Sequence, residues 1–576
     1  MVTTGARSPY NTNPAAPLDV AYWVQFRRGD YRGSPAYTGT YGFDWVEWKR
    51  NSANNPATAY DDLTAVMGKS IGDYVQCYDP GLPNIPAQPA TATQPAIPAK
   101  LGIAPHYAAV AGLYKQRYHQ ELHQGYTKRI VQGNDYYVPW LSVRPHQSVK
   151  LKLEVEFLNK EPVKPTNLFT VAAHPDYLVT INGQTNNAAP PPATPVPVLS
   201  TTSSSANPAP AAPPPAPIRL PPVNKQVLDV TIECLRPSGA TSLRVEDEHK
   251  NLVGQLNIAD NTLVYELPLR VVYVLKGIPM NPKAPIGTTP PRPLYARPGS
   301  LATVQGLFQK LNFIDYLNTR TLNQALITCT VHTPTAIPPS TQAPAPYQVL
   351  IDEAEWKAAG FVKNGLLQPQ GLHEYCEQKA NALFGPFSGL TLFAHELNIP
   401  PEGGNDIAAS GAILPVAAKT LLIYRKGLDV GKKSTIAHEL GHVLGLTHAF
   451  PVANENPELA ALQTTIPALQ ALVPQEQAAL AKLQQQAATP PTPTEQAATD
   501  QKIKGLKNLN NRINGLLNHA AVYANNPFKF TQFSTENMMD YDPSSSVDQR
   551  LSFWHWQWAL LQTDVATYYG TKTAAR

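Results

Sequence analysis

Alternation of apolar and polar residues predicts β-strands through the first half of the chain. In SVKLKLEVEF, residues 148–157, every second side chain is apolar, which is typical of a strand with one solvent-exposed face. The same pattern recurs in VLDVTIECL, while a hairpin is indicated by LRVEDEHKNLVGQL and one or two further strands by TLVYELPLRVVYVL. Shorter alternations within residues 17–60 predict additional strands. We therefore expect an all-β, sandwich-like N-terminal half.

Stretches rich in proline and small residues interrupt these strands. Residues 80–100 and 184–224 hold few large apolar side chains, and proline removes a backbone donor, so we expect irregular loops, the second of them disordered. These breaks indicate a β-rich domain over 1–144, one or two β-sandwich modules over 145–276, and a third domain over 296–576.

Helix and strand patterns alternate from about residue 296 onward. Helical spacing occurs in SLATVQGLFQKLNFIDYLN and GLHEYCEQKANALF, and strands are indicated by ALITCTV, YQVLIDEA, LTLFAHEL and KTLLIYRKG. This mixture predicts an α+β domain after the β-rich half, so the expected fold class is multidomain.

Two long amphipathic stretches predict a helical hairpin over 457–523. Apolar residues keep a spacing of three and four through 457–488 and again through 501–523, with TPPTPT between the two stretches. We expect an antiparallel hairpin inserted into the third domain, with Pro467 and Pro474 kinking or breaking its first helix. Its outer faces are polar, so we do not expect insertion into a membrane.

Composition and charge narrow the class of protein. The chain has 576 residues, 43% of them hydrophobic, and its net charge of +4 is too small to indicate nucleic acid or an anionic membrane as partner. The N-terminal MVTTGARSPYNTNPAAPLDV lacks an apolar core, so we expect synthesis in the cytoplasm without a Sec signal. The four cysteines are far apart and predict buried thiols in place of a disulfide framework; they are Cys77, Cys234, Cys329 and Cys376.

The motif HELGHVLGLTH has the spacing of a catalytic metal site. His438 and His442 are four residues apart, so on a helix both imidazoles face one metal ion at about 2.0–2.1 Å. Gly445 allows the chain to leave the helix and to return His448 as a third ligand. Three neutral histidines leave one position of Zn²⁺ open for water, and Glu439 can accept a proton from that water.

A second AHEL lies at 394–397 and carries no such spacing. His395 and Glu396 are followed by LNIP, with no histidine four residues further on, and they lie on a predicted strand. We expect no metal site there.

The motif HELGHVLGLTHAF, with STENMMDYDP downstream, resembles the metzincin clan of zinc endopeptidases and, within it, the pappalysin group. The resemblance implies a metzincin-type catalytic domain, with the three histidines as zinc ligands and Met539 in a methionine turn below the metal. It also implies that Tyr541 moves between the metal and the reacting oxyanion. Peptide substrate would lie extended along an edge strand, with 404–424 as one wall of the cleft.

The expected function is accordingly a zinc-dependent endopeptidase that hydrolyses peptide bonds with Glu439 as general base and takes a protein or peptide as substrate. A second resemblance concerns YVPWLSV, VKLKLEVEF and VTIECLRPSG, which are similar to N-terminal regions of bacterial proteins associated with type VI or related contractile injection systems. It implies an effector or toxin made in the bacterial cytoplasm and exported by injection machinery.

Two other classes of function remain open. One is a non-enzymatic adaptor of an injection system whose metal site is structural, although such a site would not need Glu439. The other is a zinc amidase that acts on peptidoglycan peptides. Latency is also open, because QCYDPGLP around Cys77 resembles the propeptide thiol switch of other metzincins.

Overall fold

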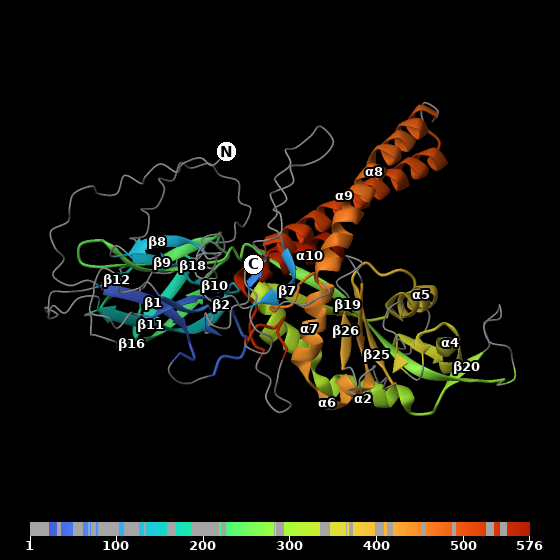
Figure 1. Ribbon diagram of the computed structural model, residues 1–576, viewed down its shortest axis with the longest axis horizontal. Helices are drawn as coiled ribbons and strands as arrows, with labels where there is room; N and C mark the ends of the chain where they lie inside the picture. Colours follow the sequence, from blue (N-terminus) through green and yellow to red (C-terminus); the bar gives the residue numbers. More distant parts are fainter. Residues whose placement is uncertain are drawn as a thin grey trace, which may run out of the picture.

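The computed structural model shows a β-sandwich from the first half of the chain, a body of mixed helices and sheet from the second half, and two long helices that project from this body (Figure 1). The residues that it describes are 22–31, 36–49, 62–66, 69–70, 76–78, 103–108, 126–131, 134–157, 169–185, 218–220, 226–281, 283, 293–334, 346–363, 366–367, 372–397, 408–411, 419–450, 455–486, 491–525, 535–541 and 550–575.

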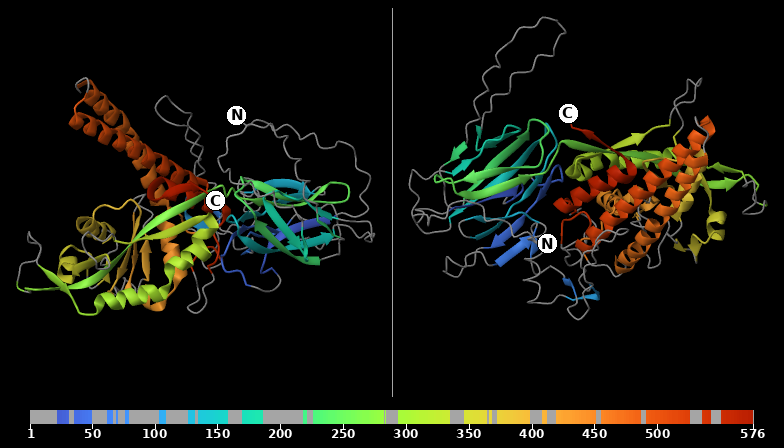
Figure 2. Two further views of the ribbon diagram at one scale, coloured as in Figure 1. Left: turned by 180° about the vertical axis from the view of Figure 1, so that it is seen from behind. Right: turned by 90° about the horizontal axis from the view of Figure 1, so that it is seen from above.

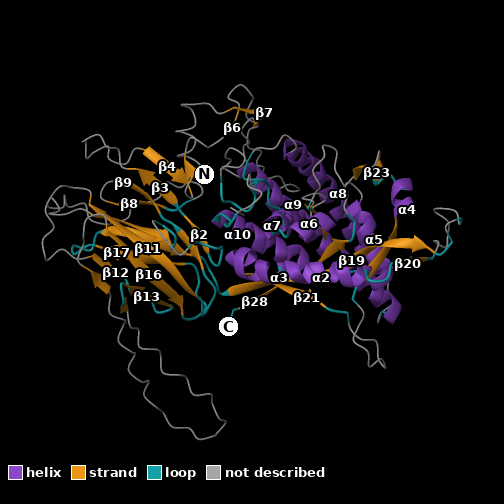
Figure 3. Ribbon diagram, turned by 90° about the horizontal axis from the view of Figure 1, so that it is seen from below, coloured by secondary structure: helices purple, strands orange, loops and turns teal. Residues whose placement is uncertain are grey.

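The sandwich consists of two sheets packed face to face, which are seen edge-on in Figure 3. The first has the order β1 (Tyr22–Arg28), β11 (Ser148–Phe157), β16 (Gln226–Cys234), β13 (Tyr177–Ile181), β14 (Gln184–Thr185). The second has the order β15 (Ile218–Leu220), β12 (Phe169–Val171), β17 (Thr241–Glu246), β18 (Leu252–Ile258), β10 (Trp140–Ser142), β2 (Gly42–Asp44). Short pairings outside these sheets involve β3 (Val46–Lys49), β4 (Asp62–Val66), β5 (Lys69–Ser70), β6 (Gln76–Tyr78), β7 (Ile103–Ala108), β8 (Lys128–Val131) and β9 (Asn134–Tyr137).

Hydrophobic alternation located a central strand and a hairpin of the sandwich correctly. Strand β11 covers 148–157 as predicted, and its apolar Val149, Leu151 and Leu153 lie in the core between the sheets. The predicted hairpin is also present, because β17 and β18 pair antiparallel.

The domain boundary expected between residues 144 and 145 is wrong. Strand β1 pairs antiparallel with β11 from Tyr22↔Phe157 to Arg28↔Leu151, and β2 and β10 complete the opposite sheet. Strands on both sides of the expected boundary therefore share one sandwich. The loop expected over 184–224 also begins with β14 and contains β15; its remaining residues, like 80–100, lie outside the described ranges. Pairing between segments this distant is not encoded in local periodicity.

One long strand organises the sheet of the C-terminal body. This strand is β19 (Leu263–Pro279), and the sheet order is β20 (Leu294–Ala296), β19, β25 (Leu390–His395), β27 (Thr420–Ile423), β26 (Ala409–Gly411). Further strands pair along β19: β21 (Ile327–His332), β22 (Gln348–Asp352) and β28 (Thr571–Ala574). The boundary expected at 276 is therefore wrong as well, because β19 belongs to this body and not to the sandwich.

Helices cover both faces of this sheet. On one face Leu269 packs in a cluster with residues of α2 (Ser300–Leu311), α7 (Lys433–Val443) and α10 (His555–Asp564). On the other face Val272 packs with residues of α4 (Glu353–Ala358) and α5 (Leu372–Phe384). The short helices α3 (Phe313–Tyr316) and α6 (Arg425–Val430) and the two-stranded pair β23 (Val362–Lys363) and β24 (Leu366–Leu367) complete the described elements of this body apart from short helical turns. The molecule is thus a multidomain combination of sheets and helices of the α+β kind.

The two projecting helices are α8 (Glu455–Gln486) and α9 (Pro493–Asn525), which lie side by side in the views of Figures 1 and 2. Glu476 and Lys502 form an ion pair of 2.5 Å, and Ile466 packs with Leu516, so the helices run antiparallel. Helix α8 continues through Pro467 and Pro474, so a break at either proline did not occur.

The prediction of buried, unpaired cysteines is confirmed for three of the four. Cys234, Cys329 and Cys376 are free and buried. The side chain of Cys77 lies outside the described residues, as does the latency hypothesis that depends on it. No helix within the described ranges is long and apolar enough to cross a membrane.

Candidate metal centre

Helix α7 presents two histidines on one face. His438 and His442 are 1% and 7% exposed, and their Nε2 atoms are 3.1 Å apart. The opposite face of the helix packs into the core through Ile436 and Leu440. The apolar side of the helix therefore fixes the direction in which both imidazoles point.

A glycine turn returns the third histidine to the same point. Gly445 has φ 85°, and its N–H donates to the His442 carbonyl at 2.9 Å while Leu446 N–H donates to the Gly441 carbonyl at 2.8 Å. These two bonds form a Schellman motif, as expected for a helix that ends at a left-handed glycine. The turn places His448 Nε2 3.2 Å from His442 Nε2.

The donor set fits a tetrahedral divalent metal. His438 Nδ1 donates to the Met538 carbonyl at 2.9 Å, and His442 Nδ1 donates to the Leu446 carbonyl at 2.8 Å. Because the proton of each neutral ring is on Nδ1, both Nε2 atoms are unprotonated and their lone pairs point toward each other. A tetrahedral Zn²⁺ with ligands at ~2.0–2.1 Å would separate two nitrogens by about 3.3 Å. His438, His442 and His448 form the cluster within the described residues that can hold a metal ion.

Burial keeps His438 of this cluster neutral. It lowers the pKa of His438 well below its ordinary value, and the neighbouring His442 and His448 lower it further. Protonation of His438 between the facing nitrogens is therefore disfavoured. A bound metal cation would instead relieve the repulsion between the lone pairs of these nitrogens.

Glu439 follows His438 on α7, and its carboxylate forms a hydrogen bond with the edge strand of the sheet. Its Oε2 accepts a hydrogen bond of 2.8 Å from the N–H of Gly411 on strand β26. A Cβ on Gly411 would lie 2.0 Å from the Glu439 carbonyl oxygen, so only glycine allows the strand to approach α7 this closely. Burial raises the pKa of Glu439 to about 7. The hydrogen bond from Gly411 N–H and the positive charge of Arg550 lower this pKa, but burial has the larger effect.

The methionine turn lies directly below α7. A Cβ on Gly441 would meet Met539 Sδ at 2.4 Å, and the Met539 carbonyl accepts a hydrogen bond of 2.9 Å from Ala449 N–H. The turn is closed by Asn537 Oδ1, which accepts from Met539 N–H at 2.9 Å. The backbone carbonyl of Met538 orients His438 by accepting from its Nδ1.

Tyr541 lies at the rim of the histidine cluster. Its ring centroid is 5.4 Å from that of His438 and 5.2 Å from that of His448, and the residue is 39% exposed. Burial of the phenol raises its pKa, and the charge of Glu439 raises it further, so the hydroxyl stays protonated at neutral pH. The structure therefore brings together every site residue that the sequence motif singled out.

Sequence reasoning missed two groups that act on this site. One is Gly411, and the other is Arg550, whose Nη2 donates to Ser434 Oγ and Thr435 Oγ1 at 2.7 Å each in the first turn of α7. Gly411 is separated from the histidine motif by a whole strand and a helix, and Arg550 follows it by about a hundred residues. No local pattern indicates either contact.

The other AHEL has only structural contacts within the described residues. Glu396 accepts hydrogen bonds from Lys276 N–H at 2.8 Å and from Ser300 Oγ at 2.6 Å, so it joins β19 to the start of α2. His395 is fully buried between Trp356 and Tyr424.

The chain was compared with protein-family models and with curated proteins. No protein-family model matches the chain, and no curated protein matches it at a significant level.

Proposed function

We propose that the protein is a zinc-dependent endopeptidase of the metzincin kind. The observation that carries this proposal is the convergence of three histidine Nε2 atoms, together with Glu439, which follows His438 on α7 and is not part of the metal-binding cluster. A structural zinc site fills all four positions with protein ligands, whereas a catalytic one keeps a position open. This difference favours hydrolysis over an adaptor role with a structural metal.

The reaction would use the residues around the open position. Zn²⁺, when bound, supplies a Lewis acid that lowers the pKa of a coordinated water to about 7. Glu439 would accept the proton of the attacking water and pass it to the leaving amine, since its carboxylate is held in place by the Gly411 N–H and is not among the clustered metal-binding groups. Tyr541 donates a hydrogen bond from its phenol to the oxyanion, and Gly411 holds the general base in place.

Peptide binding would use the edge of the sheet above α7. Among the described strands, β26 pairs on one side only, with β27, and its Gly411 contacts Glu439. An extended peptide can add to such an edge by main-chain hydrogen bonds, which would place its scissile bond near the histidines. The segment 404–424, described at 408–411 and 419–424, is then one wall of the cleft.

The wider assignment follows from the two sequence resemblances. The C-terminal body would be a pappalysin-like catalytic domain with α8 and α9 as an inserted hairpin, and the whole chain a bacterial effector or toxin delivered by contractile injection machinery. A zinc amidase that cuts peptidoglycan peptides is the second candidate, because the same three ligands and base suit any amide bond.

Metal content and hydrolysis test the proposal together. Purified protein should retain about one zinc ion per chain, measured by atomic emission, and His442→Ala should lose it. Glu439→Ala should keep zinc and the circular dichroism of the wild type, while cleavage of casein falls by about 10²–10⁴-fold. Undiminished cleavage by Glu439→Ala would refute the role of this residue. Cleavage of purified peptidoglycan without cleavage of casein would favour the amidase.

A further inference from the structure

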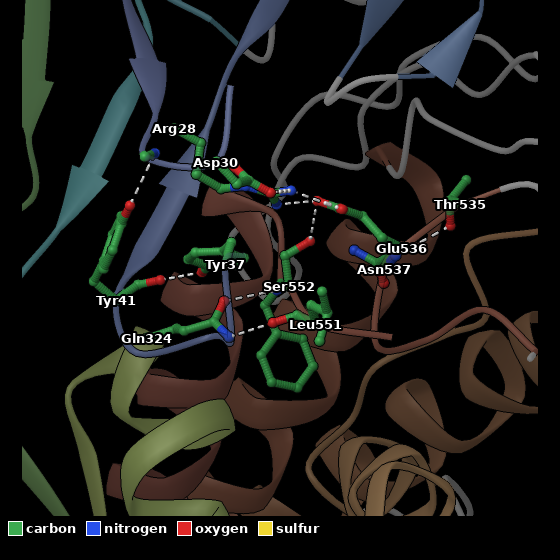
Figure 4. A network of polar contacts seen from close by, with 12 residues as sticks. Arg28, Asp30, Tyr37, Tyr41, Gln324, Thr535, Glu536, Asn537, Leu551 and Ser552 are labelled. Atoms are coloured by element: carbon green, nitrogen blue, oxygen red, sulfur yellow. Dashed lines mark hydrogen bonds and ion pairs between the residues drawn. The ribbon is translucent and has the colours of Figure 1, made fainter. Parts of the chain in front are cut away.

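The sandwich contacts the C-terminal body at the end of its first strand. Arg28, the last residue of β1, is 8% exposed, and its guanidinium forms an ion pair with Asp30 at 2.7 Å and a two-pronged ion pair with Glu536 (Figure 4). Burial opposes the charge of Arg28, but the charges of Glu536 and Asp30 more than offset this, and its pKa is raised. The contact is therefore an ion pair, buried on the side of Arg28, that joins two segments about 500 residues apart.

Glu536 belongs to the segment that supports the metal centre. It lies three residues before Met539, and its backbone carbonyl accepts hydrogen bonds from Leu551 N–H at 2.8 Å and Ser552 N–H at 3.2 Å. The Ser552 carbonyl in turn accepts from Met538 N–H at 2.7 Å. Because the Met538 carbonyl is the acceptor for His438 Nδ1, a short run of hydrogen bonds leads from Arg28 to a metal ligand.

A second connection starts from Asp44 on strand β2. Asp44 is fully buried, and its Oδ2 accepts from the N–H and the Nδ1 of His555 at 2.9 and 2.8 Å. Since His555 is the first residue of α10, the sandwich supplies a carboxylate to the N-terminus of that helix. Helix α10 carries Gln557, whose Oε1 accepts from Asn537 Nδ2 at 2.8 Å, and Asn537 closes the methionine turn.

We propose that Arg28 and Asp44 are positioning residues of the metal centre, so that the N-terminal sandwich is part of the catalytic unit and not a separable delivery module. The inference rests on the proposed function, because it takes the three histidines as metal ligands. Both contacts converge on 536–539, the segment whose backbone orients His438. Groups that orient a ligand typically change metal affinity 10–100-fold when they are removed.

The neighbouring arginine provides a matched control. Arg27 lies on the same strand, is 4% exposed, and forms its ion pair at 2.9 Å with Glu154 of β11, a residue of the same sheet. Arg27→Gln therefore removes a buried charge from β1 without touching the methionine turn. A general loss of sandwich stability would affect both variants, whereas loss of positioning would affect Arg28→Gln alone.

The test is the zinc dissociation constant of the full-length protein, measured by competition with a chromogenic chelator, with circular dichroism as a check of folding. Arg28→Gln should weaken zinc binding about tenfold or more, Arg28→Lys by less, and Arg27→Gln by less than about twofold. If Arg28→Gln does not fold, the isosteric Glu536→Gln replaces it, with a loss of at least about threefold expected. Folded variants with wild-type zinc affinity, or equal losses in Arg27→Gln and Arg28→Gln, would overturn the inference. A wild-type protein that binds no zinc would instead refute the proposed function, and the inference with it.

Discussion

Gly441 and Met539 lie so close together that a Cβ on the glycine would be 2.4 Å from the methionine sulfur. Gly441 lies between His438 and His442 in the sequence of α7, and the turn that carries Met539 packs directly against this part of the helix. The missing side chain of Gly441 thus decides how near the turn can come to the metal centre.

Gly441→Ala should push α7 and the methionine turn apart. We expect a loss of about 1–3 kcal/mol in the free energy of unfolding, the range for overpacking, and a zinc affinity lowered about tenfold or more. Gly306→Ala is the control, because Gly306 is an exposed helical glycine with no atom within 4 Å of an added Cβ. It should stabilise the protein by about 0.5–1 kcal/mol. Unchanged zinc affinity in Gly441→Ala would show that the contact adapts freely.

Gly445→Ala should displace the third ligand by straining the turn. The residue has φ 85°, a conformation that costs an L-residue roughly 1–2 kcal/mol. The zinc affinity of Gly445→Ala should fall. The zinc affinity of Gly445→Asn should fall less, because asparagine tolerates the left-handed conformation better than alanine does. Gly183→Ala, at φ 81° in the turn between β13 and β14, should lose similar stability with no change in zinc binding. Equal effects on zinc from both alanine variants would argue against a specific role of the turn.

His395 should make the protein less stable in mild acid. Burial, and then His373, lowers the pKa of His395 to about 3, while an unfolded histidine titrates near ~6.5. The unfolded state therefore binds the extra proton as the pH falls from about 6.5 to about 3, and stability falls by on the order of 1.4 kcal/mol per pH unit. Above about pH 6.5 both states are neutral and the effect vanishes.

His395→Phe tests this dependence. Neither ring nitrogen of His395 has a hydrogen-bond partner among the described residues, so the substitution should leave stability near pH 7.5 equal or higher. Urea denaturation between pH 7.5 and pH 4 should then show that the free energy of unfolding falls less steeply with decreasing pH than in the wild type. The same substitution at His249, whose side chain is 59% exposed, is the control. An unchanged slope in His395→Phe would contradict the prediction.

The projecting helices can be shortened without touching their base. Ile466 and Leu516 pack together with Tyr568, so replacing 470–511 by a short Gly/Ser loop keeps this contact and spans a helix separation of about 8–10 Å. The shortened protein should fold, bind zinc and cut small peptides, while its choice among folded protein substrates changes. Loss of zinc would make the outer part of the pair a component of the catalytic core. Unchanged cleavage of every substrate would make it a passive surface element.

Local pattern was sufficient where the determining interactions are local. The alternation in 148–157 predicted β11 with the correct inward face, because side chains of a strand alternate whatever its partners are. The spacing of His438, His442 and His448 predicted their convergence, because helix geometry and a left-handed glycine fix their relative positions.

Tertiary structure alone decided which distant segments meet. The strand pattern of 263–279 carries no sign that β19 joins the C-terminal sheet, and β1 contains no sign of its pairing with β11. Contacts such as Gly411 with Glu439 and Arg28 with Glu536 depend on how whole elements are stacked. The sequence by itself therefore determined which histidines cluster and which glutamate lies next to them on α7. The packing of sheet, helix and sandwich decided what orients these side chains, because orientation comes from contacts between elements remote along the chain.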